Sequence, residues 1–240
     1  MKNPFEYFDK IYCVNLKERT DRWKECLDNF EKFGIKNYTR LDAVKINADI
    51  HPKRKGQIGC SLSYAMCINK AINENLKNVL ILEDDFEFAL QKEDLHKRIN
   101  ATIKELPDNW DSLYFGGTIG NFYGKEPIEK YSPNLFKLNC AHTTHSIAFS
   151  HQGLRKIVKL FNNNLEWHQK LIENYEAIDV FLARDFLPNS NSFIVSDLLC
   201  YQRVSESDIE NTTYDYSQWM NHNFNQYKSK ILNEKHLWFF

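Results

Sequence analysis

The sequence predicts an α/β fold in which a mostly parallel central sheet is flanked by helices. Strand-like apolar runs alternate with amphipathic helical segments through the first half of the chain, which is the pattern of βαβ units. One run, residues 79–82, is apolar throughout, as expected of a strand buried on both faces. The 240 residues suffice for one full core, so we expect a single domain spanning residues 1–240.

Local patterns place the elements of the first half. Trp23, Leu27 and Phe30 share one face of a helix expected at residues 20–33, and Gly34 is suited to end it. Apolar residues at spacings of three and four indicate a longer helix. The full set for this half is strands at 10–15, 38–41, 79–82 and 110–115, helices at 20–33, 57–76 and 92–106, and a polar loop at 45–55.

The second half mixes element types. Gly, Asn, Pro and Ser punctuate residues 118–134, which predicts a loop. The remaining expected elements are a hairpin with strands near 135–138 and 145–149, helices at 153–161 and 176–186, and a last strand near 192–195.

Composition narrows the function classes. A net charge of −1, from 31 basic and 32 acidic residues, provides no broad basic field for nucleic acid. Apolar stretches stay short of the roughly 20 residues of a membrane span, and the N-terminus lacks the core of a secretory signal. Six cysteines without a C-x-x-C pair are typical of buried thiols in a reducing compartment. We therefore expect a cytoplasmic protein, bacterial or viral, whose apolar ending at 237–240 packs on the body or contacts a membrane peripherally.

The apolar run at 79–82 ends abruptly in Glu83, Asp84 and Asp85. Carboxylates at the carboxyl end of a parallel strand lie where ligands bind in open α/β sheets, and they suit Mg²⁺ or Mn²⁺. The triplet therefore predicts a divalent metal site. An acidic turn that caps a helix or faces water is the alternative explanation.

Two further motifs are suited to bind phosphate. Arg19 and Arg22 follow the first strand and could clamp a diphosphate with forked hydrogen bonds, although a solvated helix start explains them as well. The stretch 56–63 contains Gly59, Ser61 and Ser63 at a helix start, where small residues let an anion approach free amides. Tight helix packing is the alternative for this stretch.

Two residues of the second half are candidate site residues. Asp179 lies within the apolar segment 178–182, and an acid there is a candidate base or hydroxyl ligand, against a helix cap as the alternative. His145 follows His142 before an apolar stretch and is either a ligand-facing side chain or a satisfied structural histidine.

The order of these motifs resembles glycosyltransferase family 25, which includes lipooligosaccharide and collagen hydroxylysine galactosyltransferases. The resemblance covers residues 10–210, and its most specific part is G-x-I-G-C-x-L-S followed by L-I-L-E-D-D. The segments that carry it are Ile11–Leu16 with Arg19 and Arg22, Asp42–Val44, Gly56–Ser63, Leu80–Asp85, Trp110–Gly116, Thr144–Ala148, Ile178–Leu182 and Ser207–Ile209.

The resemblance implies a GT-A type fold, a UDP-sugar donor and Mn²⁺ or Mg²⁺. It implies a nucleotide-sugar-binding half at about residues 1–120 and an acceptor-binding half at about 121–240. Asp85 is then the expected metal ligand with Glu83 or Asp84 assisting, and Asp179 and His145 are the expected catalytic residues, Asp179 being the first candidate for the base. We expect donor contacts from Asn15, Leu16, Arg19, Arg22, Gly59, Ser61, Ser63, Glu83 and Asp84.

The resemblance implies metal-dependent transfer of a hexose, galactose or glucose, with inversion, to a glycan, glycolipid or protein hydroxyl. Two other functions stay open. The chain could be a non-catalytic nucleotide- or sugar-binding domain of the same fold. It could also be a metal-dependent phosphohydrolase, although it lacks a D-x-D-x-T nucleophile motif.

Overall fold

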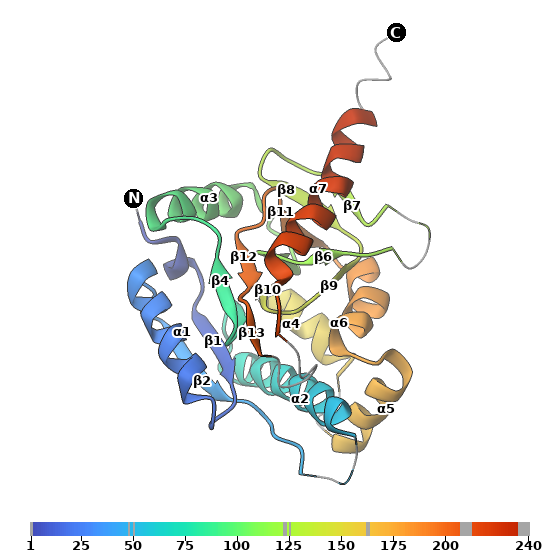
Figure 1. The fold of residues 1–240 in the computed structure, drawn as a ribbon. Helices are drawn as coiled ribbons and strands as arrows, with labels where there is room; N and C mark the ends of the chain where they lie inside the picture. Colours follow the sequence, from blue (N-terminus) through green and yellow to red (C-terminus); the bar gives the residue numbers. More distant parts are fainter. Residues whose placement is uncertain are drawn as a thin grey trace.

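The chain forms one eight-stranded sheet with helices on both of its faces (Figure 1). The computed structural model describes residues 2–47, 49, 51–121, 124, 126–161, 164–206 and 213–234. The strands follow the order β2 (Tyr38–Asp42), β1 (Lys10–Asn15), β3 (Asn78–Glu83), β10 (Ser146–Ser150), β5 (Ser112–Tyr114), β11 (Ser192–Val195), β8 (Leu135–Leu138) and β7 (Ile128–Lys130).

The α/β class and the flanked central sheet are confirmed, but the sheet is mixed rather than mostly parallel. Of its seven neighbouring pairs, three are parallel: β1 with β2, β1 with β3, and β5 with β11. Strand β10 runs antiparallel between β3 and β5. Its insertion also corrects the predicted hairpin, because β8 pairs with β7 and β11 while β10 pairs elsewhere.

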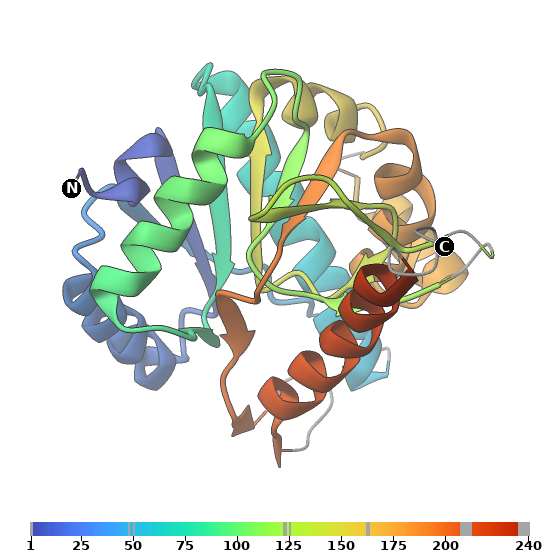
Figure 2. The same cartoon turned by 90° about the horizontal axis from the view of Figure 1, so that it is seen from above.

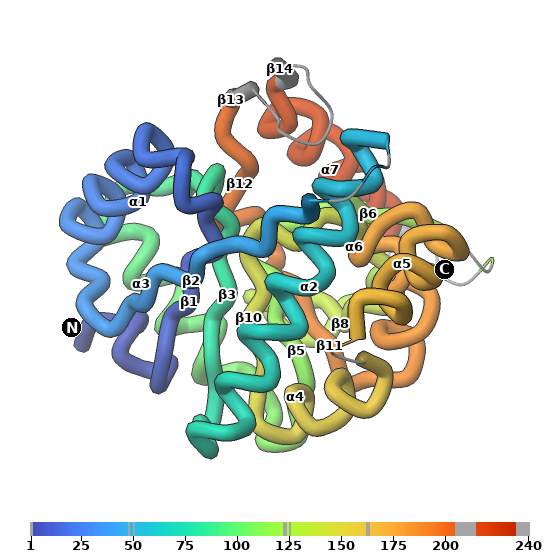
Figure 3. Tube along the Cα trace, turned by 90° about the horizontal axis from the view of Figure 1, so that it is seen from below, coloured from blue at the N-terminus to red at the C-terminus, as the bar shows by residue number. Residues whose placement is uncertain are grey.

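The helices form two layers. On one face, α2 (Pro52–Asn73) crosses the sheet and packs with α4 (His151–Val158) and α5 (Leu165–Tyr175) (Figure 3). The opposite face carries α3 (Lys92–Glu105) and α7 (Tyr216–Glu234) (Figure 2). Helix α1 (Thr20–Phe33) lies beside the β1–β2 side of the sheet and ends, as predicted, at Gly34 with a left-handed φ of 70°.

Other elements differ from the predicted ones. The expected helix at 176–186 is a short α6 (Ile178–Phe181) that continues into a π-helical segment (Leu182–Phe186) and a 3₁₀ turn (Leu187–Asn189). The expected loop at 118–134 contains strands β6 (Thr118–Ile119) and β7. Helices α5 and α7 were not predicted. The remaining short elements are a 3₁₀ turn (Pro4–Tyr7) and strands β4 (Phe86–Phe88), β9 (Ala141–His142), β12 (Cys200–Gln202), β13 (Ser205–Glu206) and β14 (Thr213–Tyr214).

The core lies on both faces of β3. Val79, Leu80, Ile81 and Leu82 are fully buried, as the unbroken apolar run predicts. All six cysteines are free thiols, and Cys60 alone among them is partly exposed. Among the described residues, helices long and apolar enough to cross a bilayer are absent. The motif at 207–209 and the apolar ending at 237–240 lie outside the described residues.

One edge of the sheet gathers the chemically active residues. Parallel pairing brings the carboxyl ends of β1 and β3 together, with Val14 opposite Glu83. Because β10 is antiparallel, the residues that precede it approach the same edge, and Ser146 pairs with Leu82. Strand β12 pairs with β4 and places Gln202 opposite Phe86, directly after the acidic triplet. Four separate segments thus meet where β3 ends.

Candidate functional site

The three acids at the end of β3, of which Glu83 is the last residue of the strand, have different partners. Asp84 accepts hydrogen bonds from the guanidinium of Arg22 at 2.7 Å and from the side-chain amide of Asn15 at 2.6 Å. Arg40 donates in turn to the amide oxygen of Asn15 at 2.6 Å. Burial alone would lower the pKa of Arg22, but the charge and hydrogen bond of Asp84, together with the charge of Asp85, outweigh it and raise that pKa. Asp84 therefore holds β1, β3 and α1 together.

Glu83 points toward the segment that precedes β10. The hydroxyl of Thr144 donates to its carboxylate at 2.5 Å, and the hydroxyl of Tyr64 lies 3.5 Å from the same oxygen. Burial, followed by the nearby charge of Asp85, raises the pKa of Glu83 to about 8. This carboxyl is therefore sensitive to any positive charge bound beside it.

Asp85 has an unsatisfied side-chain oxygen. Its Oδ1 is buried without a hydrogen-bond partner in the part of the chain that is described. Burial, followed by the charge of Asp84, raises the pKa of Asp85 to about 6. The backbone is fixed, because the Arg203 amide donates to the Asp85 carbonyl at 2.6 Å. A buried, unpartnered carboxylate oxygen next to a second desolvated carboxyl is an arrangement that a cation would stabilise.

These carboxylates fit a divalent ion that is completed by a ligand. In the described ranges, groups of three or more His, Cys, Asp or Glu arranged to hold a metal are absent. Mg²⁺-type ions are commonly held by one or two carboxylates together with substrate phosphates and water, rather than by a complete protein cage. Asp85 and Glu83 can supply that smaller share of the ligands.

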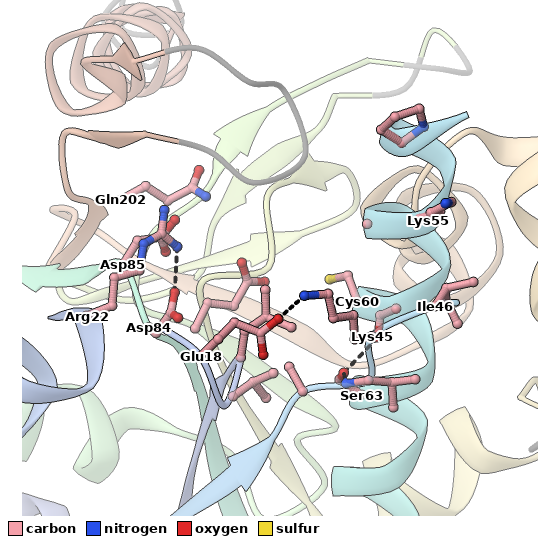
Figure 4. Close-up of a pocket in the computed structure, with 18 residues that line it drawn as sticks. Glu18, Arg22, Lys45, Ile46, Lys55, Cys60, Ser63, Asp84, Asp85 and Gln202 are labelled. Carbon is pink, nitrogen blue, oxygen red and sulfur yellow. Dashed lines mark hydrogen bonds and ion pairs between the residues drawn. The ribbon is translucent and has the colours of Figure 1, made fainter. Parts of the chain in front are cut away.

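A first cavity, the β1–α2 cavity, opens above these acids and measures about 420 Å³, within the range of small-molecule sites. Figure 4 shows Asp84, Asp85 and Gln202 on one side and Lys55 and Cys60 of α2 on the other, with Lys45, from the segment after β2, near Cys60. Lys45 forms an ion pair with Glu18. The cavity is lined by Val14, Leu16, Glu18, Arg22, Ala43, Val44, Lys45, Ile46, Pro52, Lys55, Gly56, Gly59, Cys60, Ser63, Glu83, Asp84, Asp85 and Gln202.

The small residues of α2 serve packing as well as the cavity. A Cβ on Gly59 would lie 2.3 Å from the carbonyl oxygen of Val44, so glycine is needed for this close approach. The Ser63 hydroxyl accepts from the Val44 amide at 2.9 Å. Ser61 is fully buried, 2.8 Å from Nδ1 of His168, and lies off the cavity wall. Gly59 and Ser63 thus line the cavity as expected, whereas Ser61 joins α2 to α5.

The residues at and after the end of β1 also differ in whether they line the cavity or serve packing. Leu16 and Arg22 line the β1–α2 cavity, while Asn15 is buried behind it. Arg19 forms an ion pair with Asp21 at 3.0 Å and lies outside the cavity lining. Because Arg22 is bonded to Asp84, the arrangement does not favour the predicted diphosphate clamp of two arginines. Asn15, Arg22 and Asp84 position the edge instead.

A second cavity, the α6–α7 cavity, adjoins the first and measures about 350 Å³. The two share Cys60, Glu83, Asp85 and Gln202 as lining residues. Asp179 lies on its wall, where its carboxylate accepts from the Thr143 amide at 3.0 Å and from its neighbour Val180 at 2.9 Å. The rest of the lining is Gln57, Thr118, His142, Thr143, Thr144, Ala177, Ile178, Arg203, Tyr216 and Trp219.

His145 occupies a structural position. It is fully buried, lines neither cavity, and its Nε2 lies 3.1 Å from the Cys200 carbonyl oxygen. Burial lowers its pKa to about 4, so the ring is neutral at pH 7. Its carbonyl accepts from the Glu83 amide at 3.0 Å. The geometry favours the structural alternative for His145 and leaves Asp179 as the candidate base.

Sequence reasoning missed several lining residues. Lys45 and Lys55 belong to a stretch predicted as a polar loop, and Thr144 enters the sequence analysis only as the first residue of the segment Thr144–Ala148. Trp219 belongs to a helix that was not predicted. The signal that could have identified Lys55 is Pro52, because proline favours the first turn of a helix and α2 begins there.

Comparison with known proteins identifies the family. The family model described as Glycosyltransferase family 25 (LPS biosynthesis protein) matches residues 53–238. Procollagen galactosyltransferase 2 of Mus musculus is 26% identical over 174 residues, which cover 63% of this chain and 27% of that protein. A Homo sapiens protein named inactive glycosyltransferase 25 family member 3 is 24% identical over 172 residues, covering 63% of this chain and 29% of that protein. The chain thus spans less than a third of the length of these relatives.

A solved structure of a glycosyltransferase involved in glycosylation of the major capsid of PBCV-1 also aligns. It is 13% identical with a TM-score of 0.45 and covers 84% of this chain and 95% of that one.

Proposed function

The chain belongs to glycosyltransferase family 25, and from this premise we propose that it transfers a hexose, galactose or glucose, from a UDP-sugar to a hydroxyl group. The acceptor would be a glycan, a glycolipid or a protein. The mouse relative's name, a galactosyltransferase, and the lipopolysaccharide term of the family model support this class of reaction. The proposal includes a GT-A type fold, a divalent metal ion and inversion at the transferred sugar.

The observation that carries the proposal is the pair of adjoining cavities. Group transfer needs a donor site and an acceptor site that meet at the reacting atoms. The β1–α2 and α6–α7 cavities share Glu83 and Asp85 on their common wall. We assign the donor to the β1–α2 cavity and the acceptor to the α6–α7 cavity.

The wall of the β1–α2 cavity opposite the acids suits a diphosphate. Lys45 and Lys55 carry positive charge there, and the first turn of α2 reaches the cavity at Pro52. Pro52 has no amide hydrogen and the Lys53 amide donates to Nδ1 of His51 at 3.3 Å, so the helix would attract the phosphates through its dipole rather than through free amides. These groups would bind and orient the leaving phosphates.

Asp85, assisted by Glu83, would hold the metal ion. A bound Mn²⁺ or Mg²⁺ ion supplies Lewis-acid stabilisation of the charge that develops on the diphosphate. Asp85 suits this role because its Oδ1 is desolvated and has no partner among the described residues. Asp84 would keep the turn rigid through Arg22.

Asp179 would act as the general base. It would take the proton of the acceptor hydroxyl as that oxygen forms a bond to the anomeric carbon and the bond to UDP breaks. Inversion requires the acceptor hydroxyl, bound in the α6–α7 cavity, to attack the anomeric carbon from the side opposite the UDP leaving group. A positioned base is commonly worth roughly 10²–10⁴-fold in rate.

Replacement of Asp85 tests the proposal. Asp85→Asn keeps the shape but removes the charge, so Mn²⁺-dependent hydrolysis of UDP-galactose or UDP-glucose should fall roughly 10³-fold. UDP release with and without Mn²⁺ measures this. The control is Asp94→Asn, an exposed acid on α3. Full activity of Asp85→Asn would refute the metal assignment.

A second candidate is a binding domain of the same fold without turnover. The observation that favours this candidate is the similarity to a human family member that is named inactive. Binding of UDP with Mn²⁺, without hydrolysis or transfer of either donor, would support this candidate. A cytoplasmic location, with peripheral membrane contact for a glycolipid acceptor, remains part of the main proposal.

A further inference from the structure

The wall of the α6–α7 cavity contains an aromatic pair that the proposed reaction does not use. Tyr216 and Trp219 lie three residues apart at the start of α7, so they occupy neighbouring positions on one helix face. Trp219 is 45% exposed although it is a large apolar side chain. Across the cavity lie polar groups, among them Gln57, His142 and Asp179. The cavity therefore combines one aromatic wall with hydrogen-bonding groups.

Trp219 is held in this exposed position by the rest of α7. Its neighbour Met220 is fully buried, and Phe224, one turn further, is 1% exposed. The Asn223 side chain accepts from the Ile119 amide at 2.7 Å and donates to the Ile119 carbonyl at 3.1 Å, which ties α7 to β6. The rotation of α7 is thereby fixed, and it directs Trp219 to the cavity.

We propose that Trp219, together with Tyr216, forms a stacking platform for a sugar ring of the acceptor, so that the acceptor is a saccharide rather than a polypeptide hydroxyl. A pyranose ring has a face of C–H groups and a rim of hydroxyls. An aromatic side chain binds the C–H face of the sugar by apolar contact, while polar side chains around it form hydrogen bonds with the hydroxyl groups. This inference rests on the proposed function and specifies its acceptor.

The position of the platform suits the reaction. The α6–α7 cavity meets the donor cavity at Glu83 and Asp85, and Asp179 lies on its wall. A ring stacked on Trp219 would thus occupy the cavity that contains the candidate base. Its volume of about 350 Å³ suits a small ligand rather than a folded partner.

The test measures saccharide binding and transfer separately. Lactose, methyl β-galactoside and a hydroxylysine-containing Gly-Xaa-Yaa peptide serve as probes, with ligand-observed NMR for binding and UDP release for transfer. Trp219→Ala should raise the Kd and KM for the saccharides roughly tenfold, which is about 1.4 kcal/mol. Affinity for UDP should not change, and Trp219→Phe should restore most of the loss. The matched control is Leu232→Ala, a similarly exposed apolar residue on α7 that lines neither cavity.

Each outcome is informative. Unchanged saccharide binding in Trp219→Ala overturns the platform, and so does use of the peptide as acceptor without use of either saccharide. Failure of the wild-type protein to hydrolyse UDP-sugars counts against the proposed function instead. NMR binding of the saccharides requires no turnover, so it still decides the role of Trp219 in that case. A thermal melting curve checks that each variant is folded.

Discussion

The two cavities that meet at the end of β3 are built in different ways. The β1–α2 cavity lies between regular elements, and its acidic side is fixed by the buried pair of Arg22 and Asp84. The α6–α7 cavity is assembled from short segments: the start of α7, the four-residue α6 and the residues before β10. The shape of the β1–α2 cavity therefore depends on a buried charge pair, whereas the shape of the α6–α7 cavity depends on hydrogen bonds between loops.

Thr143 illustrates the looser construction. It adopts a φ of 68°, a conformation that β-branched residues rarely take, and the Asp179 carboxylate accepts from its amide. Strained backbone of this kind costs on the order of 1–3 kcal/mol and is found where function requires it. Asp179 thus has a structural partner as well as its proposed chemical role.

The largest expected effect is on the side with buried charges. Arg22→Met should lower the free energy of unfolding by about 3–5 kcal/mol, because it leaves the Asp84 carboxylate buried without its cationic partner. Urea denaturation measures this. Arg19→Met is the matched control at the residue that precedes α1, since the Arg19–Asp21 pair is exposed at Asp21 and should contribute less than about 1 kcal/mol. Equal losses in the two variants would remove the distinction between the cavities.

A smaller effect is expected at Asp179, and it should appear in activity. Asp179→Asn retains an oxygen that accepts from the Thr143 amide but loses the base, so turnover should fall roughly 10²-fold while donor KM stays the same. Steady-state kinetics with a saccharide acceptor measures this. Glu173→Gln, an exposed acid on α5, is the control. Unchanged turnover would rule out Asp179 as the base.

The smallest effect concerns His145, which is fully buried and lines neither cavity. Its pKa is lowered from 6.5 to about 4 by burial, so the unfolded chain binds a proton that the folded chain excludes between these values. The free energy of unfolding is therefore not reduced by His145 above pH 6.5, and it falls as the pH drops from 6.5 toward 4. Between pH 7 and pH 5 the loss should be about 2 kcal/mol.

His145→Gln should remove this share of the acid sensitivity. The measurement is the difference in unfolding free energy between wild type and variant at each pH, which cancels the contributions of other groups such as Glu83. A constant difference from pH 7 to pH 5 would show that His145 accepts a proton in the folded state and would reopen its role as a base.

Much of the parallel part of the fold could be predicted from local patterns. The apolar run of β3, the helical spacing of α2 and the stop at Gly34 are properties of neighbouring residues. The antiparallel insertion of β10 could not be predicted, because it depends on which strand lies beside β3 and local periodicity is the same for either direction.

Local patterns indicate the position of the candidate site better than the separate contacts of its residues. The acidic triplet was found at the expected end of the strand, but the separate roles of Asp84 and Asp85 depend on Arg22 and Asn15, which lie more than sixty residues away in sequence. The position of Ser61 near Gly59 predicts a ligand-facing residue, but in the structure its hydroxyl is buried against His168 of α5. Tertiary contacts of this kind leave no local signal.

The shared lining of the two cavities has a consequence for selectivity. Cys60, Glu83, Asp85 and Gln202 form a common partition, so the space available on one side is not independent of what occupies the other. A bulkier group admitted through one entrance would crowd the occupant of the neighbouring chamber. The size of the ligand accepted by one cavity therefore depends on the ligand bound in the other. A substitution of a shared lining residue would alter the selectivity of both cavities together.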